Sequence, residues 1–282
     1  MGEKAENKKL RKNRQKAIQS GNSPSIVFLD TEFNATDNND QNDGLQEITQ
    51  IGAVAFRQGI PAKTFNRYCK IAPEHQITER SLGLTGISKE LLDREGVPFI
   101  QAMQDLASFL QKERAAKIYA FGAADATELR NTAKWNNADA DVYQVINQIL
   151  NLQPVFASRL SLHFVYSLKD ICKICMVDHE TAHSAVQDAI DTGKAYYNMK
   201  AQRINKQVRA ELEDRKTKIG KYRACRKVIA PQLAGSVSET TLAELKQAFF
   251  NAYTDPILAA LYDDLMMAFG TPDRMFGEQK IK

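Results

Sequence analysis

Apolar residues in this chain form short unbroken runs and longer stretches with helical spacing. The run Ile26 to Leu29 is short and continuous, which is typical of a strand buried on both faces. Two more strands are predicted over residues 48–56 and 63–71, joined at the turn-forming residues 58–61. Because short connections favour antiparallel neighbours, these three strands are expected to form a meander.

Helical spacing dominates the chain after residue 88. A loop is expected around residues 82–87, and later short strands over 117–121 and around 154–156. Helices are predicted from Ser88, from the capping residue Ser167, and over 99–114, 125–135, 141–151 and 184–199. Three strands followed by alternating helices and strands predict an α/β fold, a mixed sheet of about five strands flanked by helices.

Charge divides the chain into domains. Residues 1–23 carry a net charge of +5 and are predicted to be a flexible basic arm, and a core domain over 24–198 is acidic. A helical C-terminal extension over 199–282 begins with residues 200–228, which carry eleven Lys and Arg against three acidic residues and are expected to continue the preceding helix. This layout suits a polyanion held beside an acidic centre, although solvated helices are also often basic.

Other classes of protein are disfavoured. No apolar run approaches the roughly 20 residues of a membrane span, and no apolar segment follows the charged start as in a secretory signal. The four cysteines show no disulfide-framework spacing, so a reducing, cytoplasmic compartment is expected. Cys172, Cys175 and His179 superficially resemble zinc-ligand spacing, but the two cysteines share an apolar helix face, which favours a core role.

Two carboxylates follow the first strand directly. Side chains alternate along a strand, so Asp30 and Glu32 point to the same face. Adjacent like charges repel each other, and a divalent ion such as Mg²⁺ or Mn²⁺ would offset that cost. The alternative is a strand that ends in a solvated acidic loop.

Three later residues extend this acidic pattern. Asp125 stands at a predicted helix start, where simple N-capping is the alternative. Asp188 is predicted mid-helix among small residues, which indicates close packing, whereas Asp191 is expected to be exposed. His183 lies near the start of the same helix, where it could act as a general base or simply be a surface His.

These residues together resemble a known family. Asp30-x-Glu32, Asp125 after an apolar strand and a glycine, and His183-x₄-Asp188 are similar to the DEDDh (DnaQ-like) 3′–5′ exonucleases, which share a ribonuclease-H-like fold. Over residues 24–198, the loop 34–45 and the segments Ile48–Gly52 and Leu84–Ile87 most resemble the branch with the sporulation inhibitor KapD and the exonucleases that trim histone messenger and small RNAs. The chain departs from that branch in having Phe121 where Trp is frequent, and Asn34 and Ala35 where many relatives carry Thr.

The resemblance implies a two-metal exonuclease that releases nucleoside 5′-monophosphates from RNA or single-stranded DNA with Mg²⁺ or Mn²⁺. Asp30 would bridge both ions, Glu32 and Asp188 would complete one site, Asp125 would reach the other through water, and His183 would take a proton from the attacking water. The alternatives are a non-catalytic nucleic-acid-binding module of the same fold and a scavenger of small oligonucleotides or phosphodiesters.

Candidate substrate contacts lie outside this set. Phe33 could stack on a terminal base or belong to the core. Leu84 and Thr85, in the Leu-Thr-Gly-Ile segment, are further candidates for the 3′ end. Basic residues at helical spacing after the core could contact phosphates, namely Arg203, Lys206 and Arg209.

Overall fold

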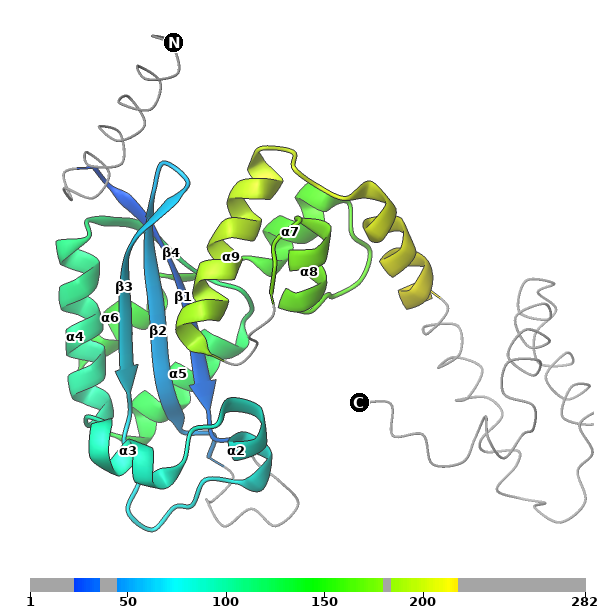
Figure 1. The fold of residues 1–282 in the computed structure, drawn as a ribbon. Coiled ribbons are helices and arrows are strands. Elements are labelled where there is room, and N and C mark those ends of the chain that lie inside the picture. Colours follow the sequence, from blue (N-terminus) through cyan, green and yellow to red (C-terminus); the bar gives the residue numbers. More distant parts are fainter. Residues whose placement is uncertain (1–22, 36–44, 180–183, 218–282) are drawn as a thin grey trace, which may run out of the picture. The chain divides into compact units, whose positions relative to one another are not determined.

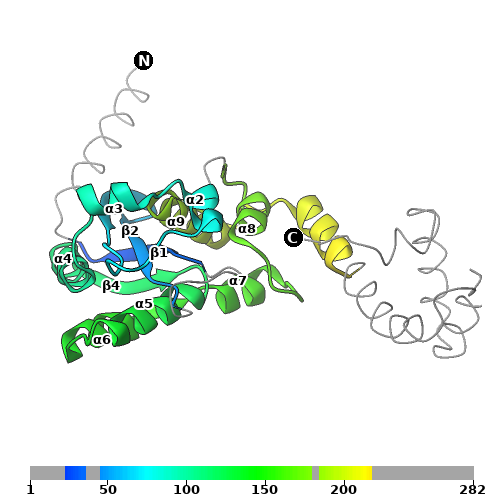
Figure 2. The ribbon, with the colours of Figure 1, turned by 90° about the horizontal axis from the view of Figure 1, so that it is seen from below.

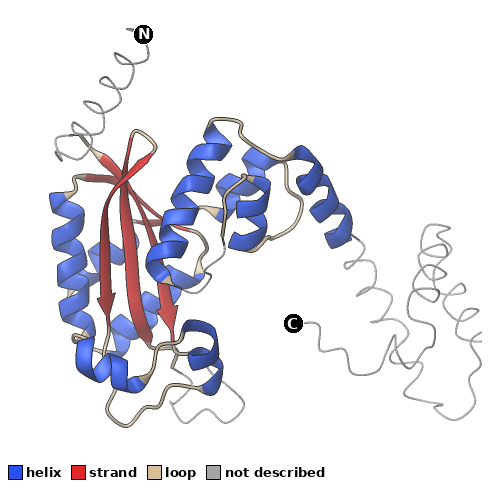
Figure 3. Ribbon diagram, viewed as in Figure 1, coloured by secondary structure: helices blue, strands red, loops and turns tan. Residues whose placement is uncertain are grey.

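The computed structural model describes residues 23–35, 45–179 and 184–217. Within them, five strands form one mixed sheet in the order β3-β2-β1-β4-β5, with helices on both faces (Figures 1 and 3). The strands are β1 (Ser25–Phe33), β2 (Ile48–Arg57), β3 (Ile60–Tyr68), β4 (Ala115–Ala120) and β5 (Ile149–Asn151). Strands β1, β2 and β3 are antiparallel neighbours, and β4 and β5 extend the sheet in parallel. The predicted fold class and meander are confirmed.

Strand β1 lies at the centre of the sheet, as its unbroken apolar run predicts. Val27, Phe28 and Leu29 are fully buried. Strand β3 begins three residues earlier than predicted, because Gln58 and Gly59 alone form the turn, with φ of 52° and 81°. Positive φ at both positions is the geometry of a two-residue hairpin turn.

Eight helices lie between residues 79 and 200, within the described part of the chain. They are α2 (Glu79–Thr85), α3 (Lys89–Glu95), α4 (Phe99–Lys112), α5 (Ala124–Trp135), α6 (Ala140–Asn147), α7 (Gln153–Leu160), α8 (Leu168–Ile174) and α9 (Ala185–Lys200). Helices α5 and α6 lie on the opposite side of the sheet from α9 (Figure 2). Val27 and Leu29 pack with α4, α5 and α6, whereas Phe28 packs against Tyr196 of α9. Alternate side chains of β1 therefore pack into two cores, one on each face of the sheet.

Two predicted elements are wrong around residue 150. The predicted helix over 141–151 ends at Asn147, and residues 149–151 form the edge strand β5, which pairs with β4. Residues 154–156 belong to helix α7, because Pro154 stands in its first turn, where the missing N–H has no intrahelical partner to lose. The predicted loop over 82–87 is also wrong, since α2 continues to Thr85 and ends at Gly86, with φ of 69°.

The predicted continuous helix over 200–228 is interrupted at its start. Helix α9 ends at Lys200, and the next residues fold back on it: the Gln202 N–H donates to the Met199 carbonyl and the Arg203 N–H to the Asn198 carbonyl. Residues 206–217 form a new helix, capped by the Asn205 side chain, and residues 218–228 lie outside the described part.

The contacts within the chain define two compact units, residues 1–208 and 209–282. Arg203 and Lys206 are exposed in the first unit, and Arg209 is half-buried in the second. Among the described helices, none combines the length and apolar character that a membrane span requires.

Candidate metal centre

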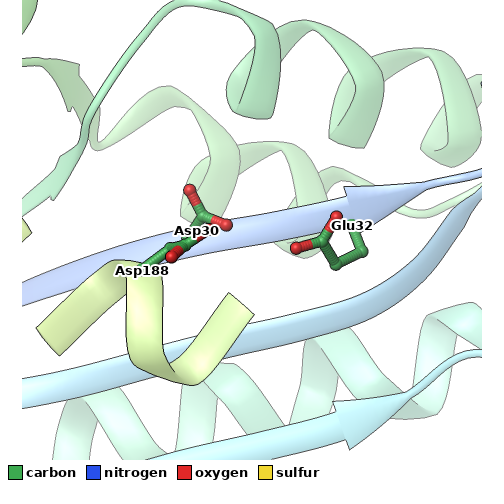
Figure 4. A group of neighbouring side chains, drawn as sticks. All are labelled: Asp30, Glu32 and Asp188. Atoms are coloured by element: carbon green, nitrogen blue, oxygen red, sulfur yellow. The ribbon is translucent and has the colours of Figure 1, made fainter. Parts of the chain in front are cut away.

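Three carboxylates meet between the end of β1 and the start of α9 (Figure 4). One oxygen from each of Asp30, Glu32 and Asp188 lies within 4.8 Å of the other two. Asp30 and Glu32 share a face of β1, as predicted from strand alternation. Asp188 stands in the first turn of α9 and not in mid-helix as predicted. A cluster of oxygen ligands of this kind suits Mg²⁺ or Mn²⁺.

Gly52 permits the close approach of α9 to the sheet. It pairs with Asp30 across β1 and β2. A Cβ at this position would lie 2.3 Å from the carbonyl carbon of Ala185 and from the backbone nitrogen of Val186. No side chain fits against that backbone, so Gly52 sets the distance at which α9 presents Asp188. A glycine inside a buried strand is itself a signal of close backbone approach, and the sequence interpretation missed it.

Asp125 is held beside this centre by the residue between the two strand carboxylates. Its Oδ1 accepts hydrogen bonds from the Thr31 N–H and the Thr31 hydroxyl, both at 2.9 Å. It does not cap its helix, because Ala123 is the N-cap residue of α5. Asp125 is not among the three carboxylates of the cluster, and its water-mediated role stays a prediction.

The carboxylates are poorly stabilised as anions in the absence of a cation. Burial, reinforced by the charges of Asp125, Asp188 and Glu32, raises the pKa of Asp30 well above its ordinary value. Burial, together with Asp188 and Asp125, raises the pKa of Glu32 to about 8. Burial also raises the pKa of Asp125 to about 6, although its bonds from Thr31 oppose the shift. A divalent cation would stabilise the charged carboxylates and offset the cost of burying them close together. The donor set therefore fits a metal centre.

The metal-free protein is expected to lose stability as pH rises from about 5 to about 8. Raised carboxyl pKa values mean that the folded state binds more protons than the unfolded state in this window, so the free energy of unfolding falls with rising pH. Thermal melts in EDTA across this pH range test the predicted loss of stability. Addition of Mg²⁺ or Mn²⁺ is expected to raise the melting temperature most at pH 8. A melting temperature in EDTA that does not change with pH would contradict the raised carboxyl pKa values.

Asp191 is buried, with 1% of its surface exposed, so the prediction of an exposed residue is wrong. It accepts hydrogen bonds from Gln187 Nε2 at 2.8 Å and Lys194 Nζ at 2.9 Å, and His179 Nδ1 lies 3.1 Å from its other oxygen. The same His179 nitrogen lies 3.7 Å from Asp188 Oδ1. The predicted base, His183, lies outside the described residues, and its role stays a prediction.

The cysteines near His179 do not form a metal group in the described part of the chain. Cys172 and Cys175 are fully buried, and the carboxylate cluster is the metal-type group found among the residues that the structure describes. This agrees with a core role for both cysteines.

Asn34 ties helix α2 to the strand that carries the carboxylates. Its side chain donates to the Gln76 carbonyl at 2.8 Å and accepts from the Thr78 N–H at 3.0 Å. The Thr78 side chain caps α2, and the residue after Asn34, Ala35, donates its backbone N–H to Ser81 Oγ at 2.7 Å. Helix α2 is therefore fixed by contacts to two residues just past Glu32, which no local sequence pattern reveals.

The candidate substrate contacts around α2 have different environments. Leu84 is 47% exposed on α2. The Thr85 hydroxyl donates to the Ser81 carbonyl and accepts from the Ile87 N–H, so its bonds are local. Phe33 is half-buried and packs against the core cluster.

Replacing Asn34 with alanine is expected to lower the free energy of unfolding by about 1–3 kcal/mol, because the buried Thr78 N–H and the partly buried Gln76 carbonyl lose their partner. Chemical denaturation measures the change. Asn131→Ala is the matched control, since Asn131 is exposed and bonds only locally to Glu128 in the described structure. Equal, small effects of both substitutions would show that Asn34 does not hold α2.

Comparison with known proteins is consistent with this geometry. A family profile described as Exonuclease (RNase_T) matches residues 27–196. Curated protein sequences give no match. The nuclease domain of 3′hExo, a DEDDh family member, bound to rAMP, shares 14% identity at a TM-score of 0.56 over 65% of this chain and 96% of that one.

Two further structures share the fold. Cell-death related nuclease 4 (CRN-4) has 18% identity and a TM-score of 0.53, covering 64% of this chain and 65% of its own. E. coli exonuclease I in complex with a dT13 oligonucleotide has 19% identity and a TM-score of 0.52, and the match covers 64% of this chain but 42% of that one. The profile match spans all five strands and the start of α9, more than half of the sequence. The chain therefore belongs to the exonuclease family.

Proposed function

We propose that this protein is a metal-dependent 3′–5′ exonuclease that releases nucleoside 5′-monophosphates from RNA or single-stranded DNA. The observation that carries the proposal is the convergence of Asp30, Glu32 and Asp188 within 4.8 Å at the edge of an exonuclease-family fold. Carboxylates with strongly raised pKa values in such a place are typical of a site built for cations.

Each residue has a role in this proposal. Asp30, Glu32 and Asp188 would hold Mg²⁺ or Mn²⁺ ions, and Asp125 would contribute to the second site through water. Bound ions would supply charge stabilisation of the phosphate and a more acidic water. Thr31 fixes the orientation of Asp125, and His183 accepts the proton of the attacking water.

The substrate's 3′ end is proposed to lie against α2. Leu84 offers an exposed apolar side chain for the terminal base, and the half-buried Phe33 could add a second contact. The Leu84–Ile87 segment also supports a place in the branch that trims RNA ends. Residues 24–198 would form the catalytic domain, with the basic segments at either side contacting single-stranded nucleic acid.

Digestion of matched 3′-labelled and 5′-labelled RNA and DNA oligonucleotides tests the proposal. With Mg²⁺ or Mn²⁺, the 3′ label should be released first as a mononucleotide, and the 5′-labelled strand should shorten progressively. EDTA should stop both. Binding without cleavage in either metal would instead support a non-catalytic module, and cleavage restricted to di- and trinucleotides would support a scavenger.

A further inference from the structure

A polar cavity between α7 and α9 is not part of the metal centre. Its volume is about 360 Å³, within the usual range for ligand sites. It is lined by Val155, Arg159, Tyr196, Met199, Lys200 and Gln202. Figure 1 shows α7 beside the C-terminal half of α9, away from the turn that carries Asp188. We propose that this cavity binds a backbone phosphate of the substrate strand, upstream of the cleaved end.

Two cations from separate helices converge on the cavity. Arg159 comes from α7 and Lys200 from α9, and none of the lining residues is acidic. In the described part of the chain, no ion pair joins either cation to a carboxylate. Lys200 Nζ lies 5.4 Å from the centre of the Tyr196 ring, which favours its position at the cavity wall. A guanidinium and an ammonium group together match a phosphate.

Arg159 and Lys200 also stand in the last turns of their helices, where cations offset the helix dipole. Offsetting the helix dipole would explain how each cation stabilises its own helix. It does not explain why both cations line the same cavity. Each helix end contributes only about half a negative charge, and the last carbonyls of α9 already accept bonds from the backbone at residues 201–203. Two full positive charges therefore dominate the potential inside the cavity.

The wall of the cavity at the end of α9 contains an unusual backbone conformation. Gln202 has φ of 58° in a helix-ending turn whose pattern usually places glycine there. Four other described helices also end with a non-glycine residue at positive φ, so this conformation shapes the cavity wall but does not by itself indicate a ligand. Gln202 lines the cavity, and the exposed Arg203 follows it directly in the chain.

The distance from the metal centre defines the expected substrate length. Lys200 is twelve residues after Asp188 on α9, which corresponds to about 18 Å along the helix. A stacked strand advances about 3.4 Å per nucleotide, so the cavity would hold a phosphate roughly five nucleotides from the cleaved bond. This inference rests on the proposed function, because it assumes that the 3′ end lies at the carboxylates.

The test compares binding of a 12-nucleotide and a 4-nucleotide single strand, measured by fluorescence anisotropy in EDTA so that cleavage plays no part. The variant is Arg159→Gln with Lys200→Gln. It should weaken binding of the 12-mer about tenfold and lower its salt slope by up to about 1.4, since each phosphate contact on a single strand contributes about 0.7. Binding of the 4-mer should not change.

The matched control is Lys112→Gln with Lys134→Gln, because these exposed lysines also stand in the last turns of helices, α4 and α5. Unchanged 12-mer affinity in the cavity variant, an equal loss for the 4-mer, or an equal loss in the control pair would each overturn the inference. Thermal melts confirm that both variants fold. Strand digestion by the unmodified protein is measured separately. Failure of the exonuclease proposal is thereby distinguished from failure of the proposal that the cavity binds a phosphate.

Discussion

Replacing Asp188 with asparagine is expected to abolish strand cleavage, with a loss of at least about 10⁴-fold, while the protein remains folded. Asparagine has nearly the same volume but no charge, so it removes an anionic ligand from the cluster without leaving a cavity. Asp30→Asn is expected to act in the same way, because Asp30 is also one of the three carboxylates of the cluster. Single-turnover cleavage of a 3′-labelled strand in Mg²⁺ and in Mn²⁺ measures the loss.

Asp188→Asn should also stabilise the metal-free protein at pH 8. The charge of Asp188 helps to raise the pKa of both Asp30 and Glu32, so removing it relieves repulsion in the folded state. Melting in EDTA should therefore shift upward, and the response of the melting temperature to Mn²⁺ should shrink. Asp141→Asn, in the first turn of α6, is the control and should leave cleavage unchanged. Near-unmodified activity of Asp188→Asn in Mn²⁺ would rule out the metal assignment.

The second large effect is expected from Gly52→Ala. A single methyl group there would stand 2.3 Å from the backbone of Ala185 and Val186, and backbone atoms cannot move aside as a flexible side chain can. The start of α9 must retreat from the sheet, which withdraws Asp188 from Asp30. We expect the free energy of unfolding to fall by about 3 kcal/mol, at the upper end of overpacking effects, together with a large loss of Mn²⁺ affinity.

Gly83→Ala provides the matched control for this substitution. Gly83 lies in helix α2, and a Cβ there would meet nothing within 4 Å. Because alanine favours a helix more than glycine does, this variant should be about 0.5–1 kcal/mol more stable. Chemical denaturation and calorimetric titration with Mn²⁺ compare the two. If Gly52→Ala binds Mn²⁺ as tightly as the unmodified protein, the close approach of α9 does not set the geometry of the cluster.

Local sequence patterns are sufficient to predict the part of the centre that lies on β1. A buried apolar run ending in Asp30 and Glu32 gives both the strand and the common direction of its carboxylates. For Asp125 the local pattern predicts only a helix start, and the family resemblance joins it to the other carboxylates; in the structure β4 is parallel to β1, so the helix after β4 starts at the same edge. The prediction for β1 depends on an apolar run and on the alternation of side chains over a few residues. Local sequence is therefore sufficient for it.

The missed features depend on contacts between distant residues. Strand β5 has three residues, and pairing with β4 overrides the helical spacing that precedes it. Asp191 was predicted to be exposed because a helix pattern does not show which other segments cover it, here His179 after α8. The Asn34 bonds to Gln76 and Thr78 join residues more than forty positions apart. Only the folded arrangement brings these groups together.

The alternation of β1 has a consequence for how the protein tolerates heat. One face of the strand end carries Asp30 and Glu32, and the intervening Thr31 holds Asp125. The same segment is paired with β2 in the interior of the sheet, so the spacing of Asp30 and Glu32 is kept as long as this pairing lasts. Amide hydrogens of residues 29–31 should be among the slowest to exchange in the described part of the chain, and heating should separate Asp30 from Glu32 only where the pairing of β1 with β2 melts.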